Sequence, residues 1–385
     1  MRRALLRRHC SNEALASATG LPWEERQMKA LAGIFGLSVV AVVATFSTER
    51  AIAEDNVQLL PPELLAPTTD KKTPPDKYKK PPPWTIGMVF PGVGNTWIIQ
   101  MAEETKYEAA HTPEIKDFIF TEANWDPTKQ VANMEDMISR KVDAIIIAPI
   151  AMPLLKKQVD AALAAGIPVI NLGWSKGALP STVEVMGGGG PFGEVGGKWL
   201  RDKLGGKGTV WAFRGVAGVQ EETDRYEGFK KAIAGSDITI GAEVFGDWNY
   251  AKAKGLCENL VLSGQPVDGI WFSGAEMTRG CIDVFKETGR PLVPMTGEGN
   301  NGFLRAWKES KLDSVAAVFT PELGPAALRA TVAILQGKSL YDHYFSDPAP
   351  ITNANLDKYY RPDLNDAFWM PSELPEAEIN KMFKK

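Results

Sequence analysis

Gly188, Gly190 and Gly193 have the G-x-G-x-x-G spacing of a loop that binds the pyrophosphate of a dinucleotide. They lie between a predicted strand and a predicted helix, as such a loop requires. An NAD site also needs an acidic residue about 20 residues further on, but the next predicted strand ends in Arg214. The loop also joins two α/β units instead of following the first strand of one. We therefore predict a chain crossover with a free backbone, and an NAD(P)-dependent reductase is the less favoured alternative.

Four tryptophans follow strands of the predicted sheets, at the carboxyl ends where open α/β sheets bind ligands. A flat indole covers the apolar C–H face of a sugar ring or of another small cyclic molecule. Each indole taken alone could equally be a packing residue, but equivalent positions in two α/β units predict a ligand crevice. The four are Trp97, Trp125, Trp174 and Trp248.

Polar side chains follow strands at the same edges, where they would hydrogen-bond the hydroxyl groups of a ligand held by the indoles. Each charged residue taken alone could instead cap a helix or lie on the solvated surface. Their shared position favours the binding interpretation for the group. The candidates are Asn95, Arg214, Glu221, Glu222, Glu276, Glu298 and Asn300.

Residue types that catalyse reactions or bind metals are sparse. His111 and His343 are the only histidines beyond residue 53. No group of His, Cys and carboxylate residues has the spacing of a metal site or of a nucleophilic triad. The sequence therefore predicts a binding protein without a cofactor or a metal, and not an enzyme.

The elements that must position these residues alternate regularly. From Trp84 to Leu172 the predicted order is βαβαβαβ, and the order resumes after the glycines and continues to Gly337. The strands are continuous apolar runs, as expected when helices cover both faces of a parallel sheet. Asp126 can cap a helix that has Pro127 in its first position. The predicted fold class is α/β, with two doubly wound, Rossmann-like parallel sheets in succession.

The N-terminal region differs in composition from the rest of the 385 residues. A basic start at Met28 precedes an apolar run that ends in a small-x-small pattern at Ala53, which is typical of a cleaved signal peptide. We expect residues 1–53 to be a signal peptide, translation to start at Met28, and the mature protein to be periplasmic. A retained membrane anchor is the alternative. Residues 54–83 are rich in proline and lysine and predict an extended linker.

The net charge of the chain bears on whether it binds nucleic acid, and its cysteines bear on whether it contains a disulfide. The formal net charge is −4, and a mildly acidic exported protein is a poor match for nucleic acid. Cys257 and Cys281 fall on predicted helices on either side of one strand. A disulfide between them and two buried free thiols are both compatible with these positions.

Five blocks of the sequence resemble consecutive blocks of one family: IGMVFPGVGNTW, DPTKQVANMEDMISRKVDAIIIAPIAMPLLKKQVDAALAAGIPVINL, DRYEGFKKAI, AEMTRGCIDVFKETG and VAAVFTPELGPAALRATVAILQGK. This family is the type I periplasmic solute-binding proteins of ABC importers, in the ribose and galactose-type sugar-binding branch. The resemblance covers residues 84–338. It implies two lobes joined by a three-stranded hinge, which close on a ligand and present it to a membrane permease.

The resemblance also implies discontinuous lobes. The N-terminal lobe would comprise residues 84–187 and 319–342, and the C-terminal lobe residues 188–318 and 343–385. We expect a monomer whose partners are a small carbohydrate-like ligand and an ABC transporter permease. A ligand-sensing subunit for a chemoreceptor or a histidine kinase is the alternative function.

Residue by residue, the resemblance implies that Asn95, Trp97 and Trp248 contact the ligand. Other polar positions of the family differ here, so we expect a sugar, polyol or sugar derivative other than ribose. This chain has Gly173-Trp174 where the family has an Asp-Arg pair, Gly188-Gly189 where it has an Asp-Asn pair, Thr223 where it has an arginine, Gly274 where it has an asparagine, and Val318 or Phe319 where it has a glutamine. A further acidic residue of the family falls at Gly297 or, with a shift of one residue, at Glu298. We expect residues 187–190 to contribute backbone groups to the cleft, if anything, and no side-chain contact.

Overall fold

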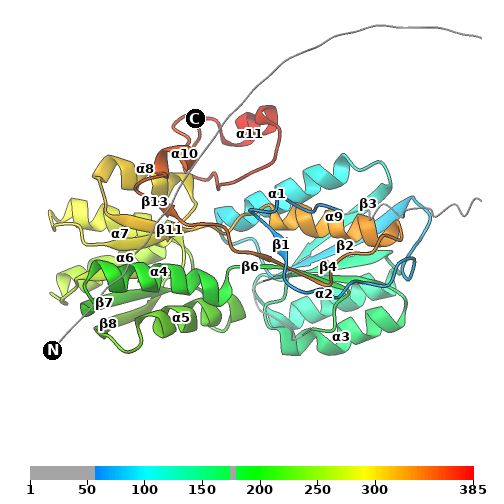
Figure 1. Cartoon of the computed structure of the whole chain (residues 1–385), viewed down its shortest axis with the longest axis horizontal. Helices are drawn as coiled ribbons and strands as arrows, with labels where there is room; N and C mark the ends of the chain where they lie inside the picture. Colours follow the sequence, from blue (N-terminus) through cyan, green and yellow to red (C-terminus); the bar gives the residue numbers. More distant parts are fainter. Residues whose placement is uncertain (1–56, 174–178) are drawn as a thin grey trace, which may run out of the picture. The chain divides into compact units, whose positions relative to one another are not determined.

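The computed structural model describes residues 57–173 and 179–385, which all lie in one compact unit, Glu54–Lys385. The predictions for residues 1–53 and for Trp174 lie outside the described residues. Two sheets, each with helices on both faces, make up this unit (Figure 1). The predicted α/β class with two doubly wound lobes is confirmed.

The first lobe is built on a seven-stranded sheet that is parallel except at its edge strand β1. Its strands, in spatial order, are β1 (Ala66–Pro67), β12 (His343–Ser346), β6 (Val183–Gly187), β5 (Val169–Gly173), β4 (Ala144–Ile147), β2 (Trp84–Phe90) and β3 (Ile115–Glu122). Two helices cover each face: α1 (Thr96–Ala110) with α9 (Leu323–Leu335), and α2 (Pro127–Ser139) with α3 (Met152–Ala164). Strand β4 is buried at every residue because helices cover it from both sides.

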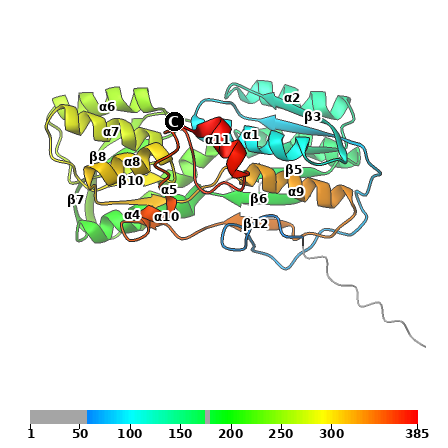
Figure 2. The ribbon, with the colours of Figure 1, turned by 90° about the horizontal axis from the view of Figure 1, so that it is seen from above.

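The second lobe is built on a six-stranded sheet that is parallel except at its edge strand β13. Its strands, in spatial order, are β13 (Ile351–Thr352), β11 (Ser314–Ala317), β10 (Met295–Glu298), β9 (Gly269–Phe272), β7 (Lys207–Arg214) and β8 (Asp237–Phe245). Helices α4 (Gly189–Lys203) and α5 (Gln220–Ile233) cover one face, and α6 (Tyr250–Leu262), α7 (Ala275–Glu287) and α8 (Asn301–Ser310) cover the other. The C-terminal tail adds α10 (Leu356–Tyr359) and α11 (Glu376–Phe383), and it runs back across α1 (Figure 2).

Within residues 179–385 the chain passes between the two sheets three times, as the predicted three-stranded hinge requires. The passages follow β6, β11 and β12. The predicted lobe boundary at residue 343 is wrong, because β12 belongs to the first sheet. It pairs in parallel with β6, from His343 opposite Glu184 to Ser346 opposite Gly187. The third passage therefore begins after Ser346.

The proline-rich segment is not an extended linker over residues 57–83. Leu59, Leu60 and Leu65 are buried in the core of the first lobe. Strand β1 pairs with the outer edge of β12, so that this edge of the sheet is covered. The linker prediction is wrong here because three buried leucines beside the prolines anchor the segment by removing apolar surface from water.

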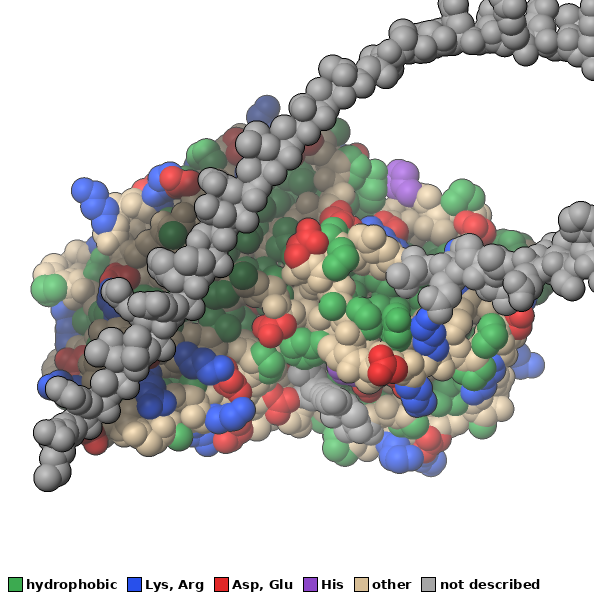
Figure 3. Space-filling view, in the orientation of Figure 1, with side chains coloured by type: hydrophobic (Ala, Val, Ile, Leu, Met, Phe, Trp, Pro, Cys, Tyr) green, Lys and Arg blue, Asp and Glu red, His purple; other side chains and the backbone are tan. Residues whose placement is uncertain are grey.

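No helix in residues 57–173 or 179–385 is long and apolar enough to cross a membrane. Acidic and basic side chains are interspersed over the uncovered part of the face in Figure 3, and no broad basic surface is visible there. This view agrees with the acidic composition, which does not favour binding to nucleic acid.

A disulfide joins Cys257 of α6 to Cys281 of α7, with their Cα atoms 5.5 Å apart. Both side chains are fully buried. Of the two alternatives that the sequence leaves open, the structure therefore contains the disulfide. It ties together two helices that cover the same face of the second sheet.

We expect this disulfide to stabilise the protein by constraining the unfolded chain. It links residues 24 positions apart. For such a loop the variant Cys257→Ala/Cys281→Ala should lose about 2–4 kcal/mol of unfolding free energy, as measured by urea denaturation. Wild-type protein under reducing conditions should lose a similar amount. Equal denaturation midpoints for oxidised and reduced wild-type protein would contradict this account.

Candidate functional site

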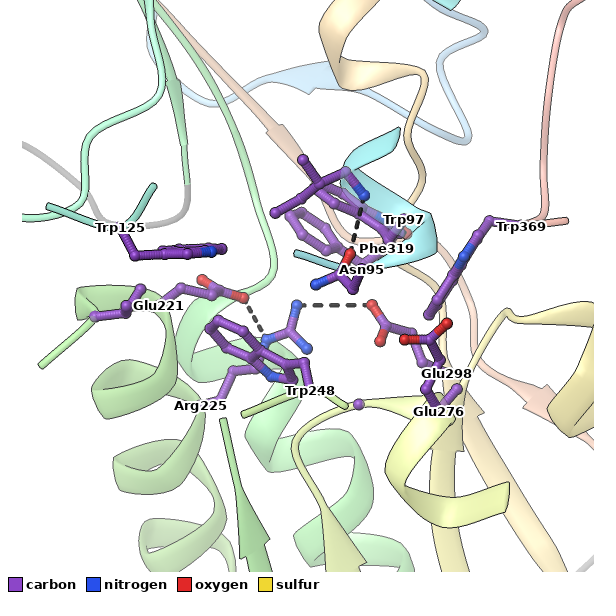
Figure 4. Close-up of a pocket in the computed structure, with 14 residues that line it drawn as sticks. Asn95, Trp97, Trp125, Glu221, Arg225, Trp248, Glu276, Glu298, Phe319 and Trp369 are labelled. Carbon is purple, nitrogen blue, oxygen red and sulfur yellow. Dashed lines mark hydrogen bonds and ion pairs between the residues drawn. The ribbon is translucent and has the colours of Figure 1, made fainter. Parts of the chain in front are cut away.

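A cavity lies between the two lobes, at the carboxyl ends of strands from both sheets. Its free space, including the opening to solvent, is about 500 Å³. Figure 4 shows that the lining comes from both lobes and from the C-terminal tail. The lining residues are Asn95, Trp97, Ile98, Trp125, Val219, Glu221, Arg225, Trp248, Gly274, Ala275, Glu276, Glu298, Phe319 and Trp369.

Trp125 and Trp248 occupy equivalent turns in the two lobes, after β3 and after β8. Each turn contains two consecutive residues with a left-handed backbone. The φ angles are 53° and 61° at Asn124 and Trp125, and 56° and 52° at Asp247 and Trp248. Residues other than glycine adopt this conformation uncommonly, and strain of this kind concentrates at functional sites.

The helix after each turn begins at a capping side chain. Asp126 accepts hydrogen bonds from the backbone N–H groups of Thr128 and Lys129 at the start of α2, as predicted. Asn249 accepts one from the N–H of Lys252 at the start of α6. Both lobes therefore present a tryptophan through the same local structure of strand, strained turn and capped helix.

The two indoles meet at one side of the cavity (Figure 4), with ring centroids 6.1 Å apart and planes inclined at 44°. The Nε1 atom of Trp248 donates a hydrogen bond to the Ser273 carbonyl at 2.9 Å. Space for the rings comes from two glycines, Gly92 after β2 and Gly215 after β7. A Cβ atom at Gly92 would overlap Trp125, and one at Gly215 would overlap Trp248. The contact between the lobes thus depends on small residues in both.

Other aromatic rings complete the walls. Trp97 stacks on Phe319 with centroids 4.6 Å apart and planes inclined at 12°, and its Nε1 donates to the Phe319 carbonyl at 2.7 Å. The Nε1 of Trp369 donates to the hydroxyl of Thr96 at 2.7 Å. The indole N–H groups of Trp97, Trp248 and Trp369 are therefore used within the protein, and these rings offer a ligand their apolar surfaces.

A buried group of charges forms the floor of the cavity. Arg225, Glu221 and Glu298 are each exposed over less than 5% of their surfaces. The Arg225 guanidinium donates to Glu221 and to the Ser273 carbonyl, the latter at 2.6 Å, and lies 3.6 Å from a carboxylate oxygen of Glu298 (Figure 4). No group of three or more His, Cys or acidic side chains in the described part of the chain could hold a metal ion.

The glycine-rich crossover binds the Glu221 carboxylate. The N–H of Gly189 donates to both carboxylate oxygens, at 3.0 and 3.1 Å. Gly188 has a φ of 71°, and a Cβ atom there would overlap this carboxylate. The start of α4, where a dinucleotide would place its pyrophosphate, is thus filled by the protein's own anion. This contradicts the dinucleotide alternative, and it engages the N–H of Gly189 within the protein.

Burial raises the pKa of the acidic lining residues, because it removes solvent from their charged forms. The pKa values of Glu221 and Glu298 rise to about 7, although the nearby Arg225 guanidinium acts in the opposite direction. Burial also raises the pKa of Glu276, which accepts a hydrogen bond from the Thr96 hydroxyl at 2.8 Å. Thr96 belongs to α1 and Glu276 to α7, so this hydrogen bond joins the two lobes at the cavity.

The structure brings most of the predicted site residues to this cavity and leaves the others elsewhere. Trp174 lies outside the described residues. Arg214, Glu222 and Asn300 do not line the cavity. Those that line it are Asn95, Trp97, Trp125, Glu221, Trp248, Glu276 and Glu298.

The three misplaced residues stabilise the fold. Arg214 binds both carboxylate oxygens of Glu222, at 2.6 and 2.8 Å. Asn300 caps α8 by accepting a hydrogen bond from the N–H of Phe303. Consecutive helical residues point about 100° apart, so Glu222 cannot face the cavity together with Glu221. The position of a residue just after a strand therefore does not show whether its side chain contacts a ligand, caps a helix or forms an ion pair within the protein.

Seven lining residues were not predicted as site residues, among them Arg225, Phe319 and Trp369. Arg225 follows Glu221 by four residues, the spacing at which helical side chains meet, and this signal could have identified it. Thr223, which the resemblance places at the family's arginine position, does not line the cavity, whereas Arg225 does. No periodic pattern in the tail pointed to Trp369, whose place depends on backbone hydrogen bonds to the distant Gln100.

Comparisons with known sequences find one family. The sequence profile of the periplasmic binding protein domain matches residues 86–339. The ribose import binding protein of Bacillus subtilis is 26% identical over 262 residues, which cover 67% of this chain and 83% of that protein. The xylitol-binding protein of Mycolicibacterium smegmatis is 29% identical over 250 residues, which cover 63% of this chain and 70% of that protein.

Solved structures share the fold. A solute-binding protein of an ABC transporter from Bacillus halodurans, with bound myo-inositol, has a TM-score of 0.64 and 26% identity, and covers 73% of this chain and 98% of its own. The periplasmic binding protein of the arabinose ABC transporter from Shewanella, bound to L-arabinofuranose, has a TM-score of 0.64 and 25% identity. That match covers 71% of this chain and 93% of the Shewanella protein.

We expect Glu298 to make the stability of the ligand-free protein depend on pH. Burial in the folded state raises the pKa of Glu298 from 4.5 to about 7. At a pH between these two values, the folded state therefore binds more protons than the unfolded state. The contribution of Glu298 to stability should therefore fall as the pH rises from about 4.5 to about 7, by about 3 kcal/mol in total.

The variant Glu298→Gln removes this titration. The stability of the variant relative to wild type, measured as the unfolding free energy in urea, should therefore be higher at pH 8 than at pH 5. Glu287→Gln, at the exposed end of α7, is the control, because it removes a surface ion pair with Lys254 and should change the unfolding free energy only slightly at either pH. A difference for Glu298→Gln that does not change with pH would argue against the raised pKa.

Proposed function

The chain belongs to the periplasmic binding protein family, and we propose that it captures a small sugar, polyol or sugar derivative between its lobes and delivers it to the permease of an ABC importer. The names of two relatives support this class of ligand, since one is a ribose import binding protein and the other a xylitol-binding protein. A related solved structure holds myo-inositol. The protein would act by binding and release, without catalysis.

The composition of the interlobe cavity carries this proposal. Sugars and polyols combine apolar C–H surfaces with hydroxyl groups, and the cavity combines aromatic walls with buried charged groups. Trp125 is supplied by the first lobe, whereas Trp248 and Arg225 are supplied by the second. A ligand in this cavity would contact both lobes at once, and its binding would favour the arrangement in which they meet.

The three passages between the sheets would serve as the hinge. Ligand would enter when the lobes separate, and the closed form, in which Thr96 and Glu276 are hydrogen-bonded, would be the one presented to the permease. In this proposal residues 1–53 direct export and are removed, and the mature protein acts as a monomer in the periplasm. We expect a ligand other than ribose, because several polar positions of the ribose-type family differ in this chain.

Isothermal titration calorimetry of the chain without residues 1–53, against pentoses, hexoses, linear polyols and inositols, tests the proposal. We expect at least one member to bind with a Kd in the micromolar range or below. Trp125→Ala and Trp248→Ala should each weaken that binding by about tenfold to a hundredfold, since each removes part of the aromatic wall.

Trp199→Ala is the matched control, because Trp199 is a part-buried residue of α4 that does not line the cavity. It should leave the Kd within about twofold of the wild-type value, a difference of less than about 0.5 kcal/mol. If no carbohydrate or polyol bound while another solute class did, the proposed ligand class would be wrong.

A further inference from the structure

The ionisable residues that line the cavity are unbalanced in charge. Glu221, Glu276 and Glu298 are acidic, and Arg225 is the only basic residue among the described lining residues. Arg225 is already engaged, because its guanidinium donates to Glu221 and to the Ser273 carbonyl. Glu298 lies 3.6 Å from the guanidinium. The cavity lining thus contains three carboxyl groups and one cation, and this cation pairs with Glu221 and Glu298 only.

Among the three acidic lining residues, Glu276 and Glu298 have less positive charge close by to offset their negative charge than Glu221 has. They lie close together in Figure 4, and the charge of Glu276 raises the pKa of Glu298. The charge of Arg279 on the same helix favours the ionised form of Glu276, although Arg279 also forms an ion pair with Asp366 at 3.1 Å. The hydrogen bonds to Glu276 come from the neutral hydroxyl and the backbone N–H of Thr96. Glu298 accepts one from the backbone N–H of Ala275. A positive charge in the cavity would therefore find two carboxyl groups with unused acceptor capacity.

Three of the four indole N–H groups that line the same cavity are already used within the protein. The indole N–H groups of Trp97, Trp248 and Trp369 donate to protein acceptors. Asn95 uses its carboxamide oxygen to cap α1, which leaves its amide N–H₂ as a donor. The cavity is thus rich in acceptors and in aromatic faces, and aromatic faces attract cations. An ammonium group supplies three donors and a positive charge, which is the complement of this lining.

We propose that the ligand is an amino sugar or an aminated polyol, whose ammonium group lies against Glu276 and Glu298 while its carbon skeleton contacts the tryptophans. This inference rests on the proposed function, because it specifies the ligand of the same interlobe cavity. The site itself is defined by the cavity and its aromatic walls, and the carboxyl groups determine which member of the sugar and polyol class it selects.

Matched ligand pairs that differ in one amine test the inference. Suitable pairs are D-glucosamine with D-glucose, D-galactosamine with D-galactose, and 1-amino-1-deoxy-D-glucitol with D-glucitol. Calorimetric titration of the wild-type protein at pH 7.5 should give at least one pair in which the aminated member binds at least about tenfold more tightly than the neutral member. N-acetylation of the preferred ligand, which removes its charge, should abolish this advantage.

Two variants locate the effect. Glu276→Gln and Glu298→Gln keep the size of the side chain and remove its charge, so each should reduce the preference for the aminated ligand at least about fivefold. Glu276→Gln is the more conservative of the two, because Glu276 is not an ion-pair partner of Arg225. Glu287→Gln on the same helix is the control, and it should leave the preference unchanged.

The possible outcomes separate this inference from the proposed function. Equal or tighter binding of the neutral members would overturn the amine assignment and leave the sugar and polyol class intact. Failure of every aminated and neutral member to bind would overturn both. A preference for the aminated member that survived both glutamine variants would also overturn the inference, because the charge would then be recognised elsewhere.

Discussion

The Arg225 guanidinium connects the chain segments that form the floor of the cavity. It donates to Glu221, whose carboxylate accepts the N–H of Gly189 at the start of α4, and to the Ser273 carbonyl just beyond β9. It also lies beside Glu298 at the end of β10. Two helices and two strands of the second lobe thus meet at one buried cation. A buried charge requires such partners, since its desolvation would otherwise cost several kcal/mol.

The first lobe contributes a different set of groups to the same cavity. It supplies Asn95, the stacked Trp97 and the strained turn at Trp125, together with the Thr96 hydroxyl that bonds to Glu276 of the other lobe. The tail adds Trp369, which donates to the same hydroxyl. One lobe therefore holds the ionisable groups and the other mainly aromatic and neutral polar groups. A ligand with both polar and apolar surfaces would be recognised fully only when the lobes are together.

The fold was predictable from the sequence because most of its strands are apolar runs that alternate with helices, some of which begin at a clear capping signal such as Asp126 before Pro127, and this pattern is local. The tryptophans at strand ends were predictable for the same reason. Long-range contacts were not. Three buried leucines anchor the proline-rich segment, whose strand β1 pairs with the distant β12. Trp369 reaches the cavity through Gln100, 269 residues earlier in the chain. Glu221 and Glu222 looked equivalent because strand-end position does not give the direction of a helical side chain.

The central claim is that one cavity, with tryptophans from both lobes around Arg225 and its carboxylate partners, is the ligand site. The most direct test is a crystal structure of the chain without residues 1–53 with its tightest-binding sugar or polyol derivative. The account predicts that the ligand contacts Trp125 and Trp248 and that a polar atom lies within hydrogen-bond distance of Glu276 or Glu298. A ligand bound outside the interlobe cavity, with these four side chains free of it, would contradict the account.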